Sequence, residues 1–158
     1  MVLQNPDAKA DEVFVRCKPG LAVDSSHSTV TLADNRSVKV PTADIFAANP
    51  DGLVTPDNTM LIHLSEPTIL ANVRSRFESK DIYTLTGSIL LAMNPFEKLP
   101  IYTEATMSNY KGKRLGAELP HIYGTAEAAY QMLAKVRSPL VGHAIVATLQ
   151  WGRRVWRG

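Results

Sequence analysis

The feature that most constrains this sequence is a rigid stretch over residues 94–102, Asn-Pro-Phe-Glu-Lys-Leu-Pro-Ile-Tyr. It directly follows the apolar run 88–93, which is typical of a strand that is apolar on both faces and buried inside a sheet. Pro95 and Pro100 restrict the backbone and remove two amide donors, so we expect the loop to keep one shape. A strand that runs into such a loop predicts either a corner that holds a ligand or a turn that only redirects the strand.

The side chains of this loop are suited to a flat, aromatic ligand. Asn94 offers a hydrogen-bond donor and an acceptor, and Tyr102 offers a ring and a hydroxyl. Together they can contact the edge and the face of a heteroaromatic base. The spacing alone leaves the purely structural alternative open.

The first fifty residues show the period-two alternation of short strands. Its apolar positions are Val13, Val15, Cys17, Val30, Leu32, Val38 and Val40. Turn-forming runs at 18–20 and 33–36 separate them, so we predict a small antiparallel β module over 12–48, after a flexible N-terminus over 1–11. A module of this size buries little surface alone and is expected to adjoin a larger body, with the domain boundary at the turn formers 49–52.

Beyond residue 52 the pattern becomes helical. Thr55-Pro56-Asp57 and Ser65-Glu66-Pro67 each combine a capping side chain with a proline, so two helix starts are predicted. From the second start, an apolar stripe opposes a polar face. The stripe is Ile69, Leu70, Val73 and Phe77, and the polar face is Asn72, Arg74, Ser75 and Arg76.

The next segments predict a sheet with helices around it. A turn at Gly87 joins two predicted strands, and two further helices are predicted over 103–110 and 120–135. One more strand is predicted over 144–149. Helices that flank a sheet predict an α/β fold over 52–135.

Composition excludes several classes of function. A net charge of +2 and a pI near 8.7 favour neither a nucleic-acid partner nor a membrane surface. The single Cys17 indicates a reducing compartment, and without a run of about eighteen apolar residues or a leader pattern we expect a cytoplasmic protein. The histidines lack metal-binding spacing and no triad or nucleophile elbow is present, so no metal site and no catalytic residue is predicted.

Four blocks of the sequence, in this order, resemble one protein family: TPDNTMLIHLSEPTILANVRSRF, DIYTLTGSILLAMNPFEKLPIY, YKGKR and PHIYGTAEAAYQML. The run from Thr55 to about Leu133 resembles the N-terminal part of the myosin motor head. Residues 12–48 also resemble the small barrel that precedes the head in many myosins.

The resemblance implies a P-loop-NTPase-type head with a mixed, mostly parallel sheet and flanking helices, preceded by a barrel-like module. It implies a cytoplasmic, cytoskeletal motor that binds actin filaments and hydrolyses ATP with Mg, although the actin contacts of the family lie beyond this sequence. By position, Asn94 and Tyr102 would contact the adenine, Pro95 would shape the loop, and Lys98 would lie near it.

One expected motif is absent from the sequence. In the family, the helix that corresponds to 120–135 leads to a strand and GESGAGKT, whose backbone amides and lysine bind the phosphates. No Gly-x-x-x-x-Gly-Lys occurs here. Phosphate contacts supply most nucleotide affinity, so we expect weak or absent ATP binding and no activity of the chain alone.

Residues 136–158 form a divergent tail that ends in WGRRVWRG. Glycine codons read out of frame give tryptophan, arginine or glycine, so a frame shift or a retained intron is one hypothesis for the tail.

The sequence leaves two functional hypotheses open. The first is a fragment of an actin motor, and the second is a non-enzymatic protein-interaction module made of a small β domain and helices. A longer frame that encodes GESGAGKT would favour the first, and stable folding without a continuation the second.

Overall fold

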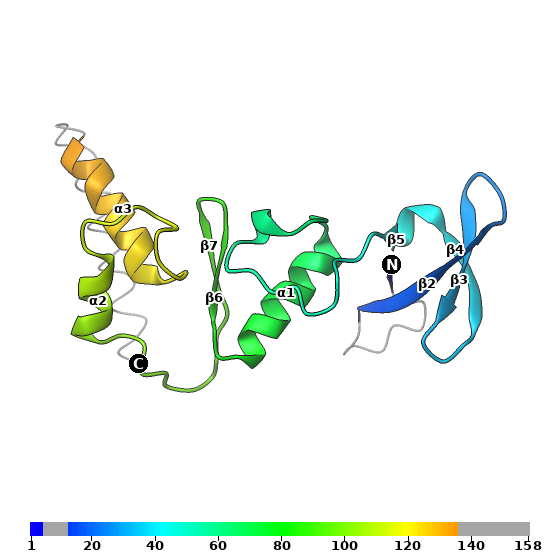
Figure 1. The fold of residues 1–158 in the computed structure, drawn as a ribbon, viewed down its shortest axis with the longest axis horizontal. Helices are drawn as coiled ribbons and strands as arrows, with labels where there is room; N and C mark the ends of the chain where they lie inside the picture. The colour runs from blue at the N-terminus through cyan, green and yellow to red at the C-terminus, as the bar shows by residue number, and fades with distance from the viewer. Residues whose placement is uncertain (5–12, 136–158) are drawn as a thin grey trace. The chain divides into compact units, whose positions relative to one another are not determined.

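A computed structural model describes Met1–Gln4 and residues 13–135 of the chain (Figure 1). The chain divides into two compact units, Met1–Lys80 and Asp81–Gly158. The predicted domain boundary at 49–52 lies inside the first unit, so the first sheet and the helix that follows it belong to the same unit.

The first unit begins with a five-stranded sheet in the order β4-β3-β2-β1-β5. Its strands are β1 (Val2–Gln4), β2 (Phe14–Ala22), β3 (His27–Leu32), β4 (Ser37–Pro41) and β5 (Ile45–Phe46), and the 3-10 helix η1 (Thr42–Asp44) joins the last two. Every described pairing is antiparallel, which confirms that part of the prediction. Closure into a barrel is not shown, since β4 and β5 are the edges. β1 lies within the predicted flexible segment 1–11, yet it pairs with both β2 and β5.

Alternate residues of these strands form the core of the sheet. The buried members are Cys17, Val30, Leu32 and Val40, with Val15, Val38 and Ile45 packed against them. All but Ile45 belong to the period-two pattern of the sequence. Successive side chains of a strand point to opposite faces, so alternate positions share the buried face. Burial also raises the pKa of the Cys17 thiol, so it stays protonated near neutral pH.

The predicted turn at 18–20 is wrong, because β2 continues through it. The pairing of β2 with β3 shifts register between Pro19 and Ala22, which marks a bulge. The turn between these strands comes later, where Asp24 Oδ1 accepts the backbone N–H groups of Ser26 (2.8 Å) and His27 (2.7 Å). A Pro-Gly pair that is typical of turns therefore lies within β2, at a bulge that interrupts its regular alternation.

Only the second of the two predicted helix starts opens an α-helix. At the first, Asp57 Oδ1 accepts the N–H of Thr59 (2.9 Å) and caps a single 3-10 turn, η2 (Asn58–Met60). At the second, Ser65 caps α1 (Glu66–Glu78), and its N–H donates to Thr68 Oγ1 (2.9 Å). This reciprocal cap fixes where α1 begins.

Only part of the predicted polar face of α1 is exposed, with Arg74 open to solvent and Ser75 half-buried. Asn72 and Arg76 are buried, whereas Leu70 of the predicted apolar stripe is exposed. The Asn72 amide accepts the N–H of Thr55 (2.9 Å) and donates to Thr55 O (3.0 Å) and Asn58 Oδ1 (2.7 Å). The segment before the helix folds over this face, because the amide satisfies backbone groups that would otherwise be buried without partners.

The second unit contains a hairpin and two helices. Strands β6 (Tyr83–Thr86) and β7 (Ile89–Ala92) pair antiparallel around the predicted turn, where Gly87 has φ 63°. Thr103 caps α2 (Glu104–Tyr110) by accepting the N–H of Thr106 (3.1 Å), and α3 runs over Ile122–Lys135. Both helices of this unit lie where the sequence predicts them.

The environment of β7 differs from the prediction of a strand inside a covered sheet. Among the described strands β7 pairs only with β6, and Ile89 is 62% exposed. No pairing in the described part of the chain is parallel. The predicted strand over 144–149 and the tail 136–158 lie outside the described residues.

Candidate functional site

The loop singled out from the sequence lines a hollow in the second unit. The hollow has a volume of about 360 Å³ and is lined by Ile82, Tyr83, Ala92, Met93, Asn94, Pro95 and Tyr102. Of the four predicted ligand-binding residues, Asn94, Pro95 and Tyr102 are therefore brought together, whereas Lys98 is exposed and is not part of the lining. Apolar walls with one amide and two phenol groups are suited to a flat heteroaromatic ligand.

Asn94 shapes the loop as well as lining the hollow. Its Oδ1 accepts the backbone N–H of Phe96 (2.9 Å), and Phe96 has φ 53°, in the left-handed region. This local bond stabilises a tight turn that non-glycine residues adopt rarely. The carbonyl end of the amide is thus used within the loop, and the Nδ2 end can serve a ligand.

Tyr102 is held through its hydroxyl. The hydroxyls of Tyr102 and Tyr83 lie 2.9 Å apart in a hydrogen bond, with Tyr102 39% exposed and Tyr83 8% exposed. Burial, reinforced by the hydrogen bond with Tyr102, raises the pKa of Tyr83, which keeps this phenol protonated at physiological pH. The Tyr83 hydroxyl is therefore an uncharged partner for the Tyr102 hydroxyl.

His121 lies at the centre of an aromatic cluster beside this pair. The distances from its ring centroid to those of four tyrosines are 5.1 Å for Tyr83, 5.6 Å for Tyr102, 5.4 Å for Tyr110 and 4.6 Å for Tyr123. His121 is 6% exposed, and its Nδ1 accepts the backbone N–H of Tyr123 (3.1 Å). The imidazole thus joins the hollow to the first turn of α3.

Burial lowers the pKa of His121, and the backbone of Ile101, which favours the protonated ring, offsets this only in part. A neutral ring is also what the Tyr123 N–H requires, since Nδ1 must present a lone pair to it. Sequence reasoning treated His121 only as a possible metal ligand. Its position directly after Pro120 and before α3 was the available signal for a capping role.

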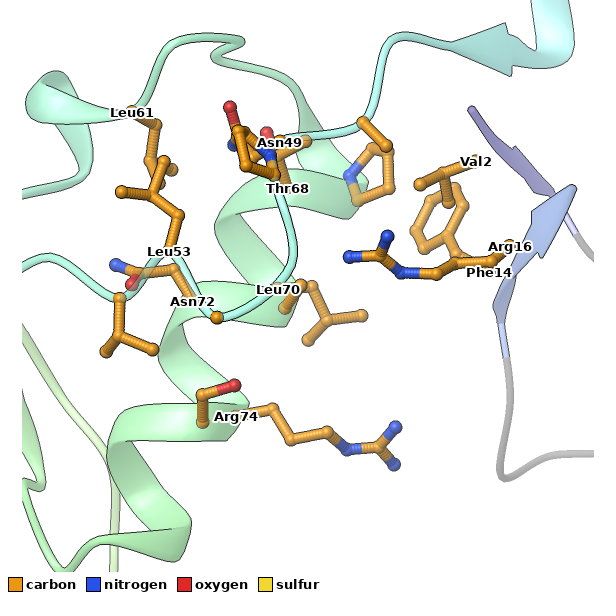
Figure 2. Close-up of a pocket in the computed structure, with 17 residues that line it drawn as sticks. Val2, Phe14, Arg16, Asn49, Leu53, Leu61, Thr68, Leu70, Asn72 and Arg74 are labelled. Atoms are coloured by element: carbon orange, nitrogen blue, oxygen red, sulfur yellow. The ribbon is translucent and has the colours of Figure 1, made fainter. Parts of the chain in front are cut away.

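A second hollow, which the sequence did not predict, lies in the first unit (Figure 2). Its volume is about 320 Å³, and its walls come from β1, β2, the segment 48–54 and α1. Arg16 and Arg74 extend into this space from β2 and α1, respectively. Arg16 is paired with Asp51 (2.5 Å), so at least one of the two charges is already balanced.

In the described part of the chain, no three His, Cys, Asp or Glu side chains form a group that could hold a metal ion. Within the same residues, no helix has both the length and the apolar character needed to cross a bilayer.

Comparison with known proteins identifies one family. Residues 55–140, more than half of the chain, match the family described as myosin head (motor domain). The chain is 38% identical to the myosin-J heavy chain of Dictyostelium discoideum over 131 residues, 51% identical to human unconventional myosin-Vc over 89 residues, and 36% identical to myosin-8 of Arabidopsis thaliana over 128 residues.

These matches cover most of this chain but little of the relatives. They span 82%, 55% and 80% of the chain, and only 5%, 5% and 8% of the three relatives, in the same order. The chain therefore corresponds to a small part of each of these proteins.

Proposed function

The chain belongs to the myosin motor-head family, and on this premise we propose that it is a segment of an ATP-dependent motor that acts on actin filaments. The ATPase activity with Mg, the actin partner and the cytoplasmic, cytoskeletal location are proposed for a longer protein of this family. The P-loop-NTPase fold with its mixed, mostly parallel sheet and the barrel-like form of residues 12–48 are also proposed for this longer protein.

For this chain we propose a site that binds the base of a nucleotide, formed by Asn94, Pro95 and Tyr102 and called here the base-binding corner. Asn94 and Tyr102 contact the base, Pro95 shapes the loop, and Lys98 lies near the bound ligand. The observation that carries this proposal is that Asn94, Pro95 and Tyr102 line one hollow of about 360 Å³. Stacking of a base on an aromatic ring contributes about 1–3 kcal/mol, which supports weak binding without further contacts.

We propose further that this chain holds the phosphates of a nucleotide poorly. No Gly-x-x-x-x-Gly-Lys is present in the sequence, and such loops provide the oriented amides and the cation that bind the β- and γ-phosphates. ATP therefore binds about as weakly as adenosine, and the chain alone does not hydrolyse it.

Binding of adenosine and of ATP with Mg, measured by ligand-observed NMR, tests both parts of the proposal. The expected dissociation constants are similar and well above about 1 mM, because about 1–3 kcal/mol of stacking is less than the roughly 4 kcal/mol that a 1 mM constant requires. Tyr102→Ala weakens binding of both ligands. Tyr130→Ala is the matched control, because Tyr130 is exposed on α3 and does not line the hollow. Much tighter binding of ATP than of adenosine would contradict the proposal that the phosphates add little to the affinity. Adenosine binding that is unchanged by Tyr102→Ala would contradict the base-binding corner.

The alternative is a non-enzymatic protein-interaction module. The hollow of the first unit favours it, because apolar side chains of the sheet (Val2, Phe14) and of α1 (Leu70) line this space beside Arg16 and Arg74 (Figure 2). A soluble, monomeric chain that unfolds in one sharp transition and does not bind adenosine would support this alternative.

A further inference from the structure

We propose that Tyr83 and His121 are positioning residues that hold the ring of Tyr102 as a preformed platform for the base. This inference rests on the proposed base-binding corner. It assigns to two buried side chains a role that neither the motifs of the sequence nor the resemblance to the family supplies.

The hydroxyl end of Tyr102 is held by Tyr83. The two hydroxyls are 2.9 Å apart, and Tyr83 lies on β6, where its residue pairs with Ala92 of β7. Tyr83 is only 8% exposed, so its own position is fixed by packing. Tyr102 remains 39% exposed, which leaves part of its ring open for a ligand.

The ring of Tyr102 is supported by His121. Their centroids are 5.6 Å apart with an interplanar angle of 52°. His121 is itself held from two sides, because its Nδ1 accepts the Tyr123 N–H (3.1 Å) and its ring stacks on Tyr110 at 5.4 Å and 24°. The Tyr110 hydroxyl in turn donates to Leu119 O (2.8 Å), which connects the support to the loop before α3.

Such an arrangement lowers the cost of binding. A free tyrosine side chain must be ordered when a base stacks on it, whereas one that is fixed at the hydroxyl and at the ring has already lost this freedom. Loss of either support should therefore increase the motion of Tyr102 before any ligand is added, and should weaken base binding afterwards.

The first test needs no ligand. Fluorine NMR relaxation of fluorotyrosine in the 158-residue chain, at concentrations below the onset of aggregation, measures the motion of the Tyr102 ring. Tyr83→Phe removes one hydroxyl and should increase this motion, whereas Tyr130→Phe on the exposed face of α3 should leave it unchanged. Equal Tyr102 motion in the wild type and in Tyr83→Phe would overturn the proposal.

The second test is a double-mutant cycle with adenosine as the probe. One neutral hydrogen bond corresponds to a change of about two- to tenfold in affinity, and Tyr83→Phe should weaken adenosine binding by about this factor. In the Tyr102→Phe background, which has already lost the bond, Tyr83→Phe should have no further effect. An equal effect in both backgrounds would show that Tyr83 acts independently of Tyr102 and would overturn the proposal.

The two tests separate this inference from the proposed function. If Tyr83→Phe mobilises Tyr102 but the wild type does not bind adenosine, the base-binding corner fails while the positioning contact stands. If the wild type binds adenosine through Tyr102 but Tyr83→Phe changes neither motion nor affinity, only the positioning inference fails.

A pair of variants isolates the part played by His121. His121→Asn keeps a side chain that can cap α3 but removes the ring, and His121→Phe keeps a ring but removes the acceptor for Tyr123. The expected result is an ordered Tyr102 in His121→Phe and a mobile one in His121→Asn. Equal Tyr102 motion in the two variants would contradict a role for the His121 ring, and the Tyr83→Phe result remains decisive if either variant fails to fold.

Discussion

His121 shows how one side chain can cap a helix and also pack against the rings beside a candidate ligand site. Its Nδ1 satisfies a backbone N–H in the first turn of α3, a group that has no partner within the helix. Its ring lies against Tyr83 and Tyr102 at the hollow. Protonation would therefore remove a cap and place a buried positive charge at the positive end of a helix.

The stability of the second unit should therefore decrease below neutral pH. The pKa of His121 is lowered from 6.5 in the folded state, so the unfolded chain takes up the proton first as the pH falls. Neutral His121 makes its full contribution to the free energy of unfolding above about pH 6.5. Between the pKa of the unfolded chain and that of the folded chain, the free energy of unfolding falls by about 1.4 kcal/mol for each pH unit.

Thermal unfolding followed by circular dichroism from about pH 7.5 to about pH 5 measures this effect. His121→Asn should flatten the pH dependence, and His63→Asn, at an exposed histidine of the first unit, should preserve it. A wild-type transition temperature that does not change over this range would contradict the prediction.

The sequence indicated individual residues where their chemistry was unusual for a loop. A planar amide, a proline and an aromatic ring after a strand led to Asn94, Pro95 and Tyr102, and all three line the hollow. The contact of Tyr83 with Tyr102 was missed because the two hydroxyls belong to residues 19 positions apart in sequence. Asn72 was assigned to the polar face of the helix. Its burial could not be predicted, because it depends on hydrogen bonds to Thr55 and Asn58, which are distant in sequence.

At the scale of elements, the bulge in β2 depends on a single glycine. A side-chain Cβ at Gly20 would lie 2.1 Å from the backbone oxygen of Thr29 on β3, which is closer than atoms can approach. Glycine is thus required here by the adjacent strand and not by a turn.

Gly20→Ala should separate β2 from β3 near the bulge and destabilise the first unit by more than about 2 kcal/mol. Gly52→Ala is the control, because Gly52 has φ +76° with open space around it and should cost only about 1 kcal/mol of backbone strain. Urea unfolding of both variants gives the comparison, and equal destabilisation would argue against a clash with Thr29.

Elements with local signals were predicted well from the sequence. Ser65 and Thr103 cap helices that begin where predicted, and Gly87 forms the predicted hairpin turn. The Pro-Gly pair in β2 and the Thr55 segment were misinterpreted because pairing with β3 and bonding to Asn72 override their local preferences. Contacts between residues distant in sequence determine the conformation of both segments, and these contacts cannot be read from a single sequence.

At the scale of the whole molecule, the most consequential feature is the edge of β7 that no other described strand covers. Among the described strands it pairs only with β6, and its first residue, Ile89, is 62% exposed. An apolar strand whose backbone groups face no other strand along one edge is a template for pairing with a second chain, and among the described residues β7 is such a strand. We therefore expect the isolated chain to aggregate.

Ile89→Lys should reduce this association, because a charge on an edge strand opposes pairing with another chain. Met132→Lys is the control, since it adds the same charge at an exposed apolar residue on helix α3. Light scattering against concentration compares the two variants. An equal reduction by both would indicate general apolar attraction, and a monomeric wild type would contradict the prediction.

The position of β1 also bears on how the protein is synthesised. This strand is synthesised before β2 and β5, yet it lies inside the sheet between them. Its second partner exists only after Ile45 and Phe46 have been added. The nascent chain must therefore keep Val2–Gln4 available until β5 has been synthesised, and a partner that binds these residues beforehand would delay assembly of the sheet.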